Sequence, residues 1–126
     1  MYSKTGSLIF LSIACAGGLA NAVSLGYGQQ LQESDQANHW VIWTEGENAC
    51  PGMTVLDTNI VDSPCDQPFI VQGVTYKFGA CNGGTEPASL LNANGEIIAF
   101  CNLDHDKINC HKGLHDIVKH GVCGTA

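Results

Sequence analysis

The chain has 126 residues, with 12 acidic residues against 5 lysines, no arginine, 7 cysteines and 5 histidines, so its formal charge is −7. A chain of this length folds as one domain at most. Its acidity and its lack of arginine argue against binding to nucleic acid or to an anionic membrane surface, because both need clusters of Lys and Arg.

The first 22 residues have the order of a secretory signal peptide. Lys4 precedes an apolar stretch from Ser7 to Ala16, and Ala20-Asn21-Ala22 supplies small residues in an A-x-A cleavage pattern. The apolar stretch is shorter than the roughly 20 residues that a membrane-spanning helix needs. We therefore predict cleavage after Ala22, a secreted, extracellular protein and no membrane insertion after cleavage.

Cleavage would change the number of cysteines from odd to even. It removes Cys15, which is also the lipid acceptor in the alternative reading as a lipoprotein, and leaves six cysteines. Six cysteines in a small exported chain indicate three disulfides, whose pairing the sequence leaves open. No Cys-x-x-Cys is present, so neither a thioredoxin-like pair nor a paired-knuckle zinc site is indicated. The predicted disulfide cysteines are Cys50, Cys65, Cys81, Cys101, Cys110 and Cys123.

The mature chain begins with a segment that has little to bury. Residues 23–38 contain two glycines and several polar residues, and we predict a flexible N-terminal arm there, followed by a single disulfide-stabilised domain over residues 39–126. The aromatic and β-branched run from Trp40 to Thr44 predicts a buried strand. We expect one of its two tryptophans in the core and the other on the rim of the core. The alternative is an exposed binding platform.

Further strands follow in the middle of the chain. Alternating or β-branched runs predict strands from Met53 to Leu56, from Phe69 to Gln72 and from Val74 to Phe78. Asn94-Gly95 predicts a hairpin from Ser89 to Cys101, with positive φ at both central turn residues. In that hairpin Ser89 would pair with Phe100, and Leu91 with Ile98.

In the C-terminal segment the spacing of the apolar residues changes from that of a strand. Its apolar residues recur at helical spacing, which predicts a helix from about Asp106 to His120: Cys110, Leu114, Ile117, Val118 and Gly121. The expected fold class is therefore α+β, a small antiparallel sheet of four or five strands with one C-terminal helix, stabilised by three disulfides. An all-β sandwich with a helical tail is the alternative.

Histidine clustering is the one pattern that suggests chemistry. On the predicted helix His111 and His115 point the same way, whereas His105 and His120 point elsewhere. His111 and His115 are therefore the candidate metal ligands, although zinc would need at least one further protein ligand. The glutamate of the helical zincin motif is missing between them. The simpler interpretation is that both histidines lie on a solvent-exposed flank of the helix.

No catalytic signature accompanies these histidines. The segment beginning Asp104-His105-Asp106 lacks the glycine and the terminal glutamate of a calcium loop, and no G-x-S-x-G is present. An acid-base ribonuclease would need a cation for the phosphate, which a chain without arginine supplies poorly. The sequence therefore predicts no catalytic residue and no cofactor, with a hydrolase as the less favoured alternative.

At the level of a class, the chain resembles the small secreted cysteine-rich proteins of filamentous fungi, on its signal peptide, its length and its six scattered cysteines. The resemblance implies a non-enzymatic interaction protein, an effector that acts on a host or a competing microbe through an unknown extracellular protein or glycan. Two alternatives remain. An antimicrobial or killer-type toxin fits poorly with the negative charge, and an extracellular metal-binding protein would depend on His111 and His115.

Overall fold

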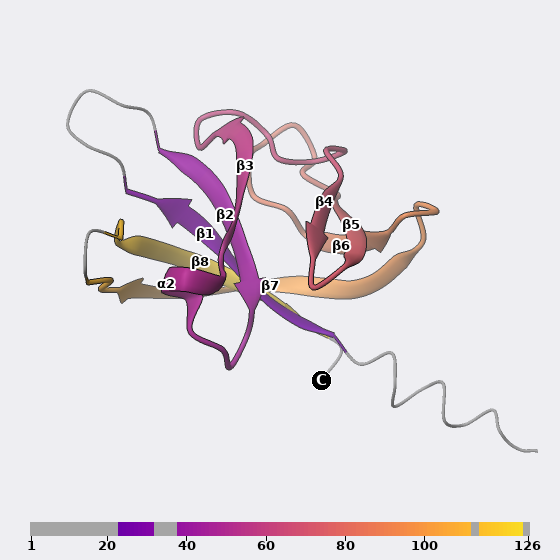
Figure 1. Cartoon of the computed structure of the whole chain (residues 1–126). Helices are drawn as coiled ribbons and strands as arrows, with labels where there is room; N and C mark the ends of the chain where they lie inside the picture. Colours follow the sequence, from indigo (N-terminus) through magenta and orange to yellow (C-terminus); the bar gives the residue numbers. More distant parts are fainter. Residues whose placement is uncertain (1–22, 32–37, 112–113, 125–126) are drawn as a thin grey trace, which may run out of the picture.

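The computed structural model describes residues 23–31, 38–111 and 114–124 (Figure 1). The predicted signal peptide, residues 1–22, and residues 32–37 of the predicted arm lie outside this part. No helix among the described residues is long and apolar enough to cross a membrane. The elements are β1 (Ser24–Gln30), β2 (His39–Thr44), α2 (Ala49–Gly52), β3 (Thr54–Asn59), β4 (Phe69–Val71), β5 (Val74–Gly79), β6 (Ser89–Asn92), β7 (Ile97–Ile108) and β8 (Ile117–Gly124).

The eight strands of the described residues form one antiparallel sheet, in the order β3-β2-β1-β8-β7-β6-β5-β4. Its end strands, β3 and β4, approach each other. The Thr54 hydroxyl donates to the Ile70 carbonyl over 3.1 Å, and the Thr58 hydroxyl donates to the side chain of Gln67. The sheet therefore curls into a nearly closed barrel.

Large apolar side chains fill the barrel. Strand residues point to opposite faces in turn, so Trp40 and Ile42 of β2 face inward together with Tyr27 of β1. The ring centroids of Tyr27 and Phe78 lie 5.5 Å apart, and those of Phe69 and Phe78 lie 5.0 Å apart. The buried cluster consists of Leu25, Tyr27, Trp40, Ile42, Leu56, Phe69, Val71, Tyr76, Phe78, Leu90, Ala99 and Cys123.

The predicted C-terminal helix, residues 106–120, is wrong, and so is the α+β fold class. β7 and β8 occupy this region and pair with each other, and β8 also pairs with β1. These two partners supply backbone hydrogen bonds on both sides of β8, a gain that a local apolar stripe does not reveal. The all-β alternative with a helical tail is not observed either. Burial along β8 follows the period of a strand, with buried Ile117, Lys119, Gly121 and Cys123.

The flexible arm predicted over residues 23–38 contains a central strand instead. β1 pairs with β2 on one side and with β8 on the other. Its glycines serve close packing, because a Cβ on Gly26 would lie 2.4 Å from the indole of Trp43 and one on Gly28 would lie 2.2 Å from the Val118 carbonyl oxygen. Glycine here marks contact between neighbouring strands rather than freedom of the chain.

The predicted strands of the middle region are confirmed. β2, β3, β4 and β5 overlap the four runs identified in the sequence, and β6 and β7 form the predicted hairpin. Trp40 and Trp43 are both buried, the first inside the barrel and the second on its outer wall. Neither tryptophan therefore forms an exposed binding platform.

The turn of the hairpin differs from the predicted one. Only Gly95 has a positive φ, of 85°, and Asn94 does not. The side-chain oxygen of Asn92 instead accepts from the backbone N–H groups of Asn94 and Glu96, at 2.9 and 3.0 Å. A side-chain acceptor thus replaces the second left-handed residue in reversing the chain.

Candidate functional site

The three predicted disulfides are confirmed. Cys101–Cys123 joins directly opposite residues of β7 and β8, and Cys50–Cys110 joins α2 to the connection between these strands. Cys65–Cys81 joins the segments on either side of β4 and β5. Oxidised cysteines offer no thiolate, so all six serve the scaffold rather than catalysis or metal binding.

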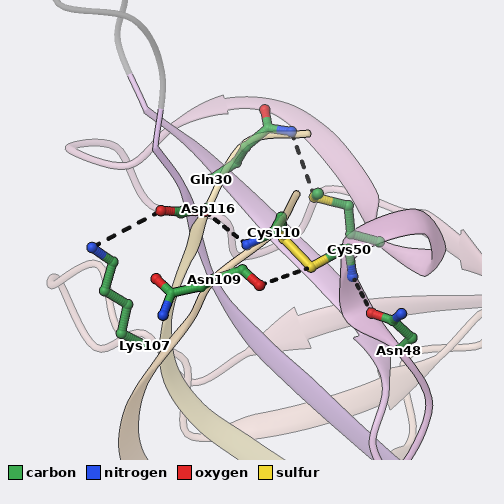
Figure 2. The surroundings of a disulfide bond; sticks show 8 residues. Gln30, Asn48, Cys50, Lys107, Asn109, Cys110 and Asp116 are labelled. Carbon is green, nitrogen blue, oxygen red and sulfur yellow. Dashed lines mark hydrogen bonds and ion pairs between the residues drawn. A yellow bond between two sulfur atoms is a disulfide. The ribbon is translucent and has the colours of Figure 1, made fainter. Parts of the chain in front are cut away.

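Figure 2 shows the surroundings of the Cys50–Cys110 disulfide. The Asp116 carboxylate accepts the backbone N–H of Cys110 over 2.7 Å and lies 4.0 Å from Lys107 Nζ. On the α2 side, the Asn48 side chain accepts the backbone N–H of Cys50 over 3.1 Å. Polar side chains thus hold the backbone on both sides of the bond, as expected of a structural connection.

His111 and His115, the candidate metal ligands, lie in the connection between β7 and β8. His111 is exposed and His115 half-buried, and the two residues between them lie outside the described part. The helical geometry that would place both imidazoles on one face does not form. The described residues contain no group of three or more His, Cys, Asp or Glu side chains placed to hold a metal ion. The spacing of these histidines therefore no longer argues for a shared metal ion.

The fold instead brings together His105 and His120, which the predicted helix would have separated. Their ring centroids lie 6.1 Å apart. His120 Nδ1 lies 2.8 Å from the Glu86 carboxylate, and Nε2 lies 3.0 Å from the Gln29 amide nitrogen. Because that nitrogen only donates, neutral His120 accepts at Nε2 and donates from Nδ1 to Glu86. The Trp40 indole meets the imidazole edge to face, 5.3 Å away.

This arrangement fixes His120 in place rather than leaving it ready to react. Both ring nitrogens have partners, and Gln29 in turn accepts from the Asn38 side chain over 2.7 Å. A general base needs a nitrogen that faces its substrate. Sequence reasoning missed Glu86 because it lies in the loop between β5 and β6, 34 positions from His120.

A second polar cluster surrounds Lys119. This buried lysine donates to Glu45 over 2.8 Å and to Asp104 over 3.2 Å. Burial alone would lower the pKa of Lys119, but hydrogen bonds to Glu45 and Asp104 and their negative charges outweigh it, so the net pKa is raised. The amine therefore stays protonated, which suits an internal ion pair and not a nucleophile.

One apolar region on the outer wall of the barrel is covered by α2. Val41 and Trp43 of β2 and Ile117 of β8 form a second cluster with Ala49 of α2. Figure 1 shows α2 lying over this side of the sheet, away from β4, β5 and β6. The short helix and its disulfide thus shield this region from water.

A second apolar region, on β4, β6 and β7, is exposed to solvent. Ile70, Ile97 and Phe100 are 58%, 57% and 65% exposed, and Leu91, which pairs with Ile97, is half-buried. We call these four residues the outer apolar face. Phe100 projects from the wall because both of its paired neighbours are small, Ser89 on β6 and Gly124 on β8. The outer apolar face therefore presents an exposed aromatic ring.

A bulge in the β6–β7 pairing creates this face. Ser89 pairs with Phe100, as predicted, whereas Leu91 pairs with Ile97 rather than with Ile98. One residue of β7 is thus left over between the two pairs. Residues three apart on a regular strand would face opposite sides. The bulge instead places Ile97 and Phe100 on the same outer side.

Lys77 lies within the outer apolar face, on β5, the strand between β4 and β6. It pairs with Leu91, which in turn pairs with Ile97. Lys107 and Lys119 both have carboxylate partners, whereas no ion pair among the described residues involves Lys77. The outer apolar face therefore carries a cation that can meet a carboxylate from outside.

Comparisons of the chain with models of protein families, with curated proteins and with solved structures gave no match. The chain's own residues are therefore the basis for assigning a function.

Proposed function

We propose that the chain is a secreted, disulfide-stabilised, non-enzymatic binding protein, an effector that contacts a protein of a host or a competing microbe through the outer apolar face. The exposure of Ile70, Ile97 and Phe100 is the observation that carries the proposal. Exposed groups of large apolar side chains are costly in water and mark interaction sites. The comparable apolar region on the other side of the barrel is covered by α2.

The chemistry of the face defines the partner. Aromatic side chains near the centre of an interface supply much of its binding energy, and Phe100 is the aromatic residue of the outer apolar face. Lys77 adds a positive charge to a chain whose formal charge is −7. The matching partner segment presents an aliphatic or aromatic side chain next to a carboxylate. Electrostatic attraction to Lys77 would fix its orientation.

The scaffold supports the secreted location. Three disulfides join segments of the described chain, and such bonds persist in oxidising compartments outside the cytosol. The N-terminal Lys4, apolar stretch and Ala20-Asn21-Ala22 fit export and cleavage. Detection of the processed chain in the medium of its source, beginning at Val23, would test this part of the proposal.

Selection from a displayed library of random peptides tests the binding surface. We expect selected peptides to combine an apolar residue with an adjacent Asp or Glu. Phe100→Ser should weaken their binding by about tenfold or more, a loss typical of a central aromatic contact, and Lys77→Gln should weaken only the acidic peptides. Val61→Ser is the matched control, because Val61 is 73% exposed but lies in a loop outside the face.

Two outcomes would contradict the proposal. One is a set of peptides whose affinity is unchanged by Phe100→Ser and by Lys77→Gln. The other is turnover of glycans, nucleic acids or esters by the purified protein, which would make it an enzyme. Both variants change exposed or half-exposed side chains, so their unfolding curves should match the unmodified protein to within about 0.5 kcal/mol.

A further inference from the structure

An open cavity lies at one end of the barrel, where β1 begins, β2 ends and β4 turns into β5. Its volume is about 170 Å³. Leu25, Val71 and Tyr76, which belong to the buried core, form part of its wall, and the half-exposed Val74 lies at its rim. The cavity therefore extends from the surface to the core. The mouth of a β-barrel is a frequent place for a small ligand.

The size of this mouth cavity limits what it holds. An apolar cavity of roughly 150 Å³ is sufficient for one benzene ring. The mouth cavity is slightly larger. It therefore fits one six-membered ring with a small substituent, or an alkyl group of similar size.

The lining of the mouth cavity defines the chemistry of its ligand. Its eight lining residues are all uncharged. Four of them are aliphatic, and the other four, Ser24, Thr44, Tyr76 and Gln72, bring three hydroxyl groups and an amide. Burying a charged group without a counter-charge is costly, whereas a hydroxyl can exchange hydrogen bonds with Thr44 or Gln72. We propose that the mouth cavity binds an uncharged, ring-sized small molecule that carries a hydroxyl group.

One charge can reach this cavity after processing. Removal of residues 1–22, which the proposed secretion implies, would make Val23 the first residue, and Val23 lines the cavity. A free α-amino group has an ordinary pKa of about 7.7 to 8.0. Binding is therefore measured near pH 9.5, about 1.5 units above that value, where such a group is uncharged.

Benzyl alcohol is the probe, and benzoate is its charged counterpart of similar size. In an NMR titration of the purified, oxidised protein, benzyl alcohol should shift the methyl signals of Leu25, Val71 and Val74 in a saturable way. The expected dissociation constant is roughly 1 to 10 mM, as for a ligand of so few atoms. Benzoate should bind at least about tenfold more weakly, because its charge loses water without a counter-charge.

Substitutions connect this binding to the cavity. Val74→Phe should fill the mouth and weaken benzyl alcohol binding about tenfold, whereas Val61→Phe, an equal change at an exposed position outside the cavity, should leave it unchanged. Thr44→Val removes a hydroxyl at constant size and should weaken binding about threefold to tenfold. If Val74→Phe does not fold, benzyl alcohol binding by Thr44→Val tests the proposal in its place.

Three results would overturn the proposal: no saturable shift up to roughly 100 mM benzyl alcohol, about ten times the weakest expected dissociation constant, equal binding of benzoate, or unchanged binding in folded Val74→Phe and in Thr44→Val. None of these results bears on the outer apolar face. Thr44 lies outside that face, so peptide binding by Thr44→Val should match that of the unmodified protein.

Discussion

The indole of Trp43 lies against the backbone of Gly26, its directly paired neighbour across β1 and β2. A Cβ at position 26 would come within 2.4 to 2.6 Å of three atoms of this ring. Trp43 thus occupies the space where a side chain of β1 would stand. This close approach helps to bury Trp43 on the outer wall of the barrel, in the apolar cluster that α2 covers.

Gly26→Ala should therefore destabilise the protein. The added methyl group must displace the Trp43 ring or separate two central strands, and overpacking of this kind costs about 1 to 3 kcal/mol. Denaturant unfolding monitored by tryptophan fluorescence measures the loss. Gly52→Ala is the matched control, since a Cβ there has no atom within 4 Å. Equal stability of the two variants would show that the Trp43 contact is loose.

Glu45→Gln should cost more stability than Asp104→Asn, although both carboxylates bind Lys119. The Glu45 side chain is 34% exposed and that of Asp104 is 62% exposed. Water can therefore take the place of Asp104 as a partner of Lys119 more easily than it can take the place of Glu45. We expect a loss of about 1 to 2 kcal/mol for Glu45→Gln and less than about 1 kcal/mol for Asp104→Asn. The reverse order in denaturant unfolding would contradict this account of the ion pair.

The same cluster predicts a pH dependence. The raised pKa of Lys119 means that the folded state holds its proton more tightly than the unfolded state. The stability that Lys119 contributes is fully present below the ordinary lysine pKa and is lost as the pH rises through the raised value. In denaturant unfolding, Lys119→Met should therefore show a smaller alkaline loss than the unmodified protein, the remainder being that of Tyr27, whereas Lys107→Met, which changes an exposed lysine, should show the full loss.

Tyr27 should ionise late in an alkaline titration followed by phenolate absorbance. Burial, and secondly the negative charge of Glu86, raises the pKa of Tyr27 to about 12. Unfolded tyrosine ionises near its ordinary value of 10.0, so stability should fall as the pH rises from 10 to 12. Glu86→Gln should lower the pKa of Tyr27 only partly. A return to the ordinary value in this variant would contradict burial as the main cause.

Removal of Cys50–Cys110 should destabilise the protein more than removal of Cys65–Cys81. The first bond closes a sequence separation of 60 and the second one of 16. By the loop-closure relation these bonds contribute about 4 and about 3 kcal/mol through the unfolded state. Paired Cys→Ala variants, compared by denaturant unfolding, should differ by about 1 kcal/mol. Equal losses would show that native contacts, and not loop length, set the difference.

Local patterns predicted the hairpin and the middle strands, but they failed where the partners of a strand are distant. The segment around Ile117 carries both a helical stripe and a strand-like alternation. Pairing with β1 and β7 decides between them. The alternation was hidden because Lys119 counts as a surface residue in a sequence, and its partner Glu45 lies 74 positions away.

The candidate sites depended on the same distant information. The pairing of His111 with His115 required a helix, and without it the fold brings His105 close to His120 instead. Ile97 and Phe100 were both assigned to the hairpin, yet an unbroken strand would have placed them on opposite faces. Only the bulge puts them on one surface. Its position depends on cross-strand packing that residue types alone do not specify.

β8, the last strand among the described residues, lies in the middle of the sheet, between β1 and β7. During synthesis, β1 therefore has only one of its two neighbours, β2, until β8 has been made. The same holds for Cys101, whose partner Cys123 belongs to that last strand. Oxidation that runs ahead of synthesis would give Cys101 a wrong partner. Correct pairing of the cysteines thus requires that thiol oxidation is delayed or corrected until β8 is in place.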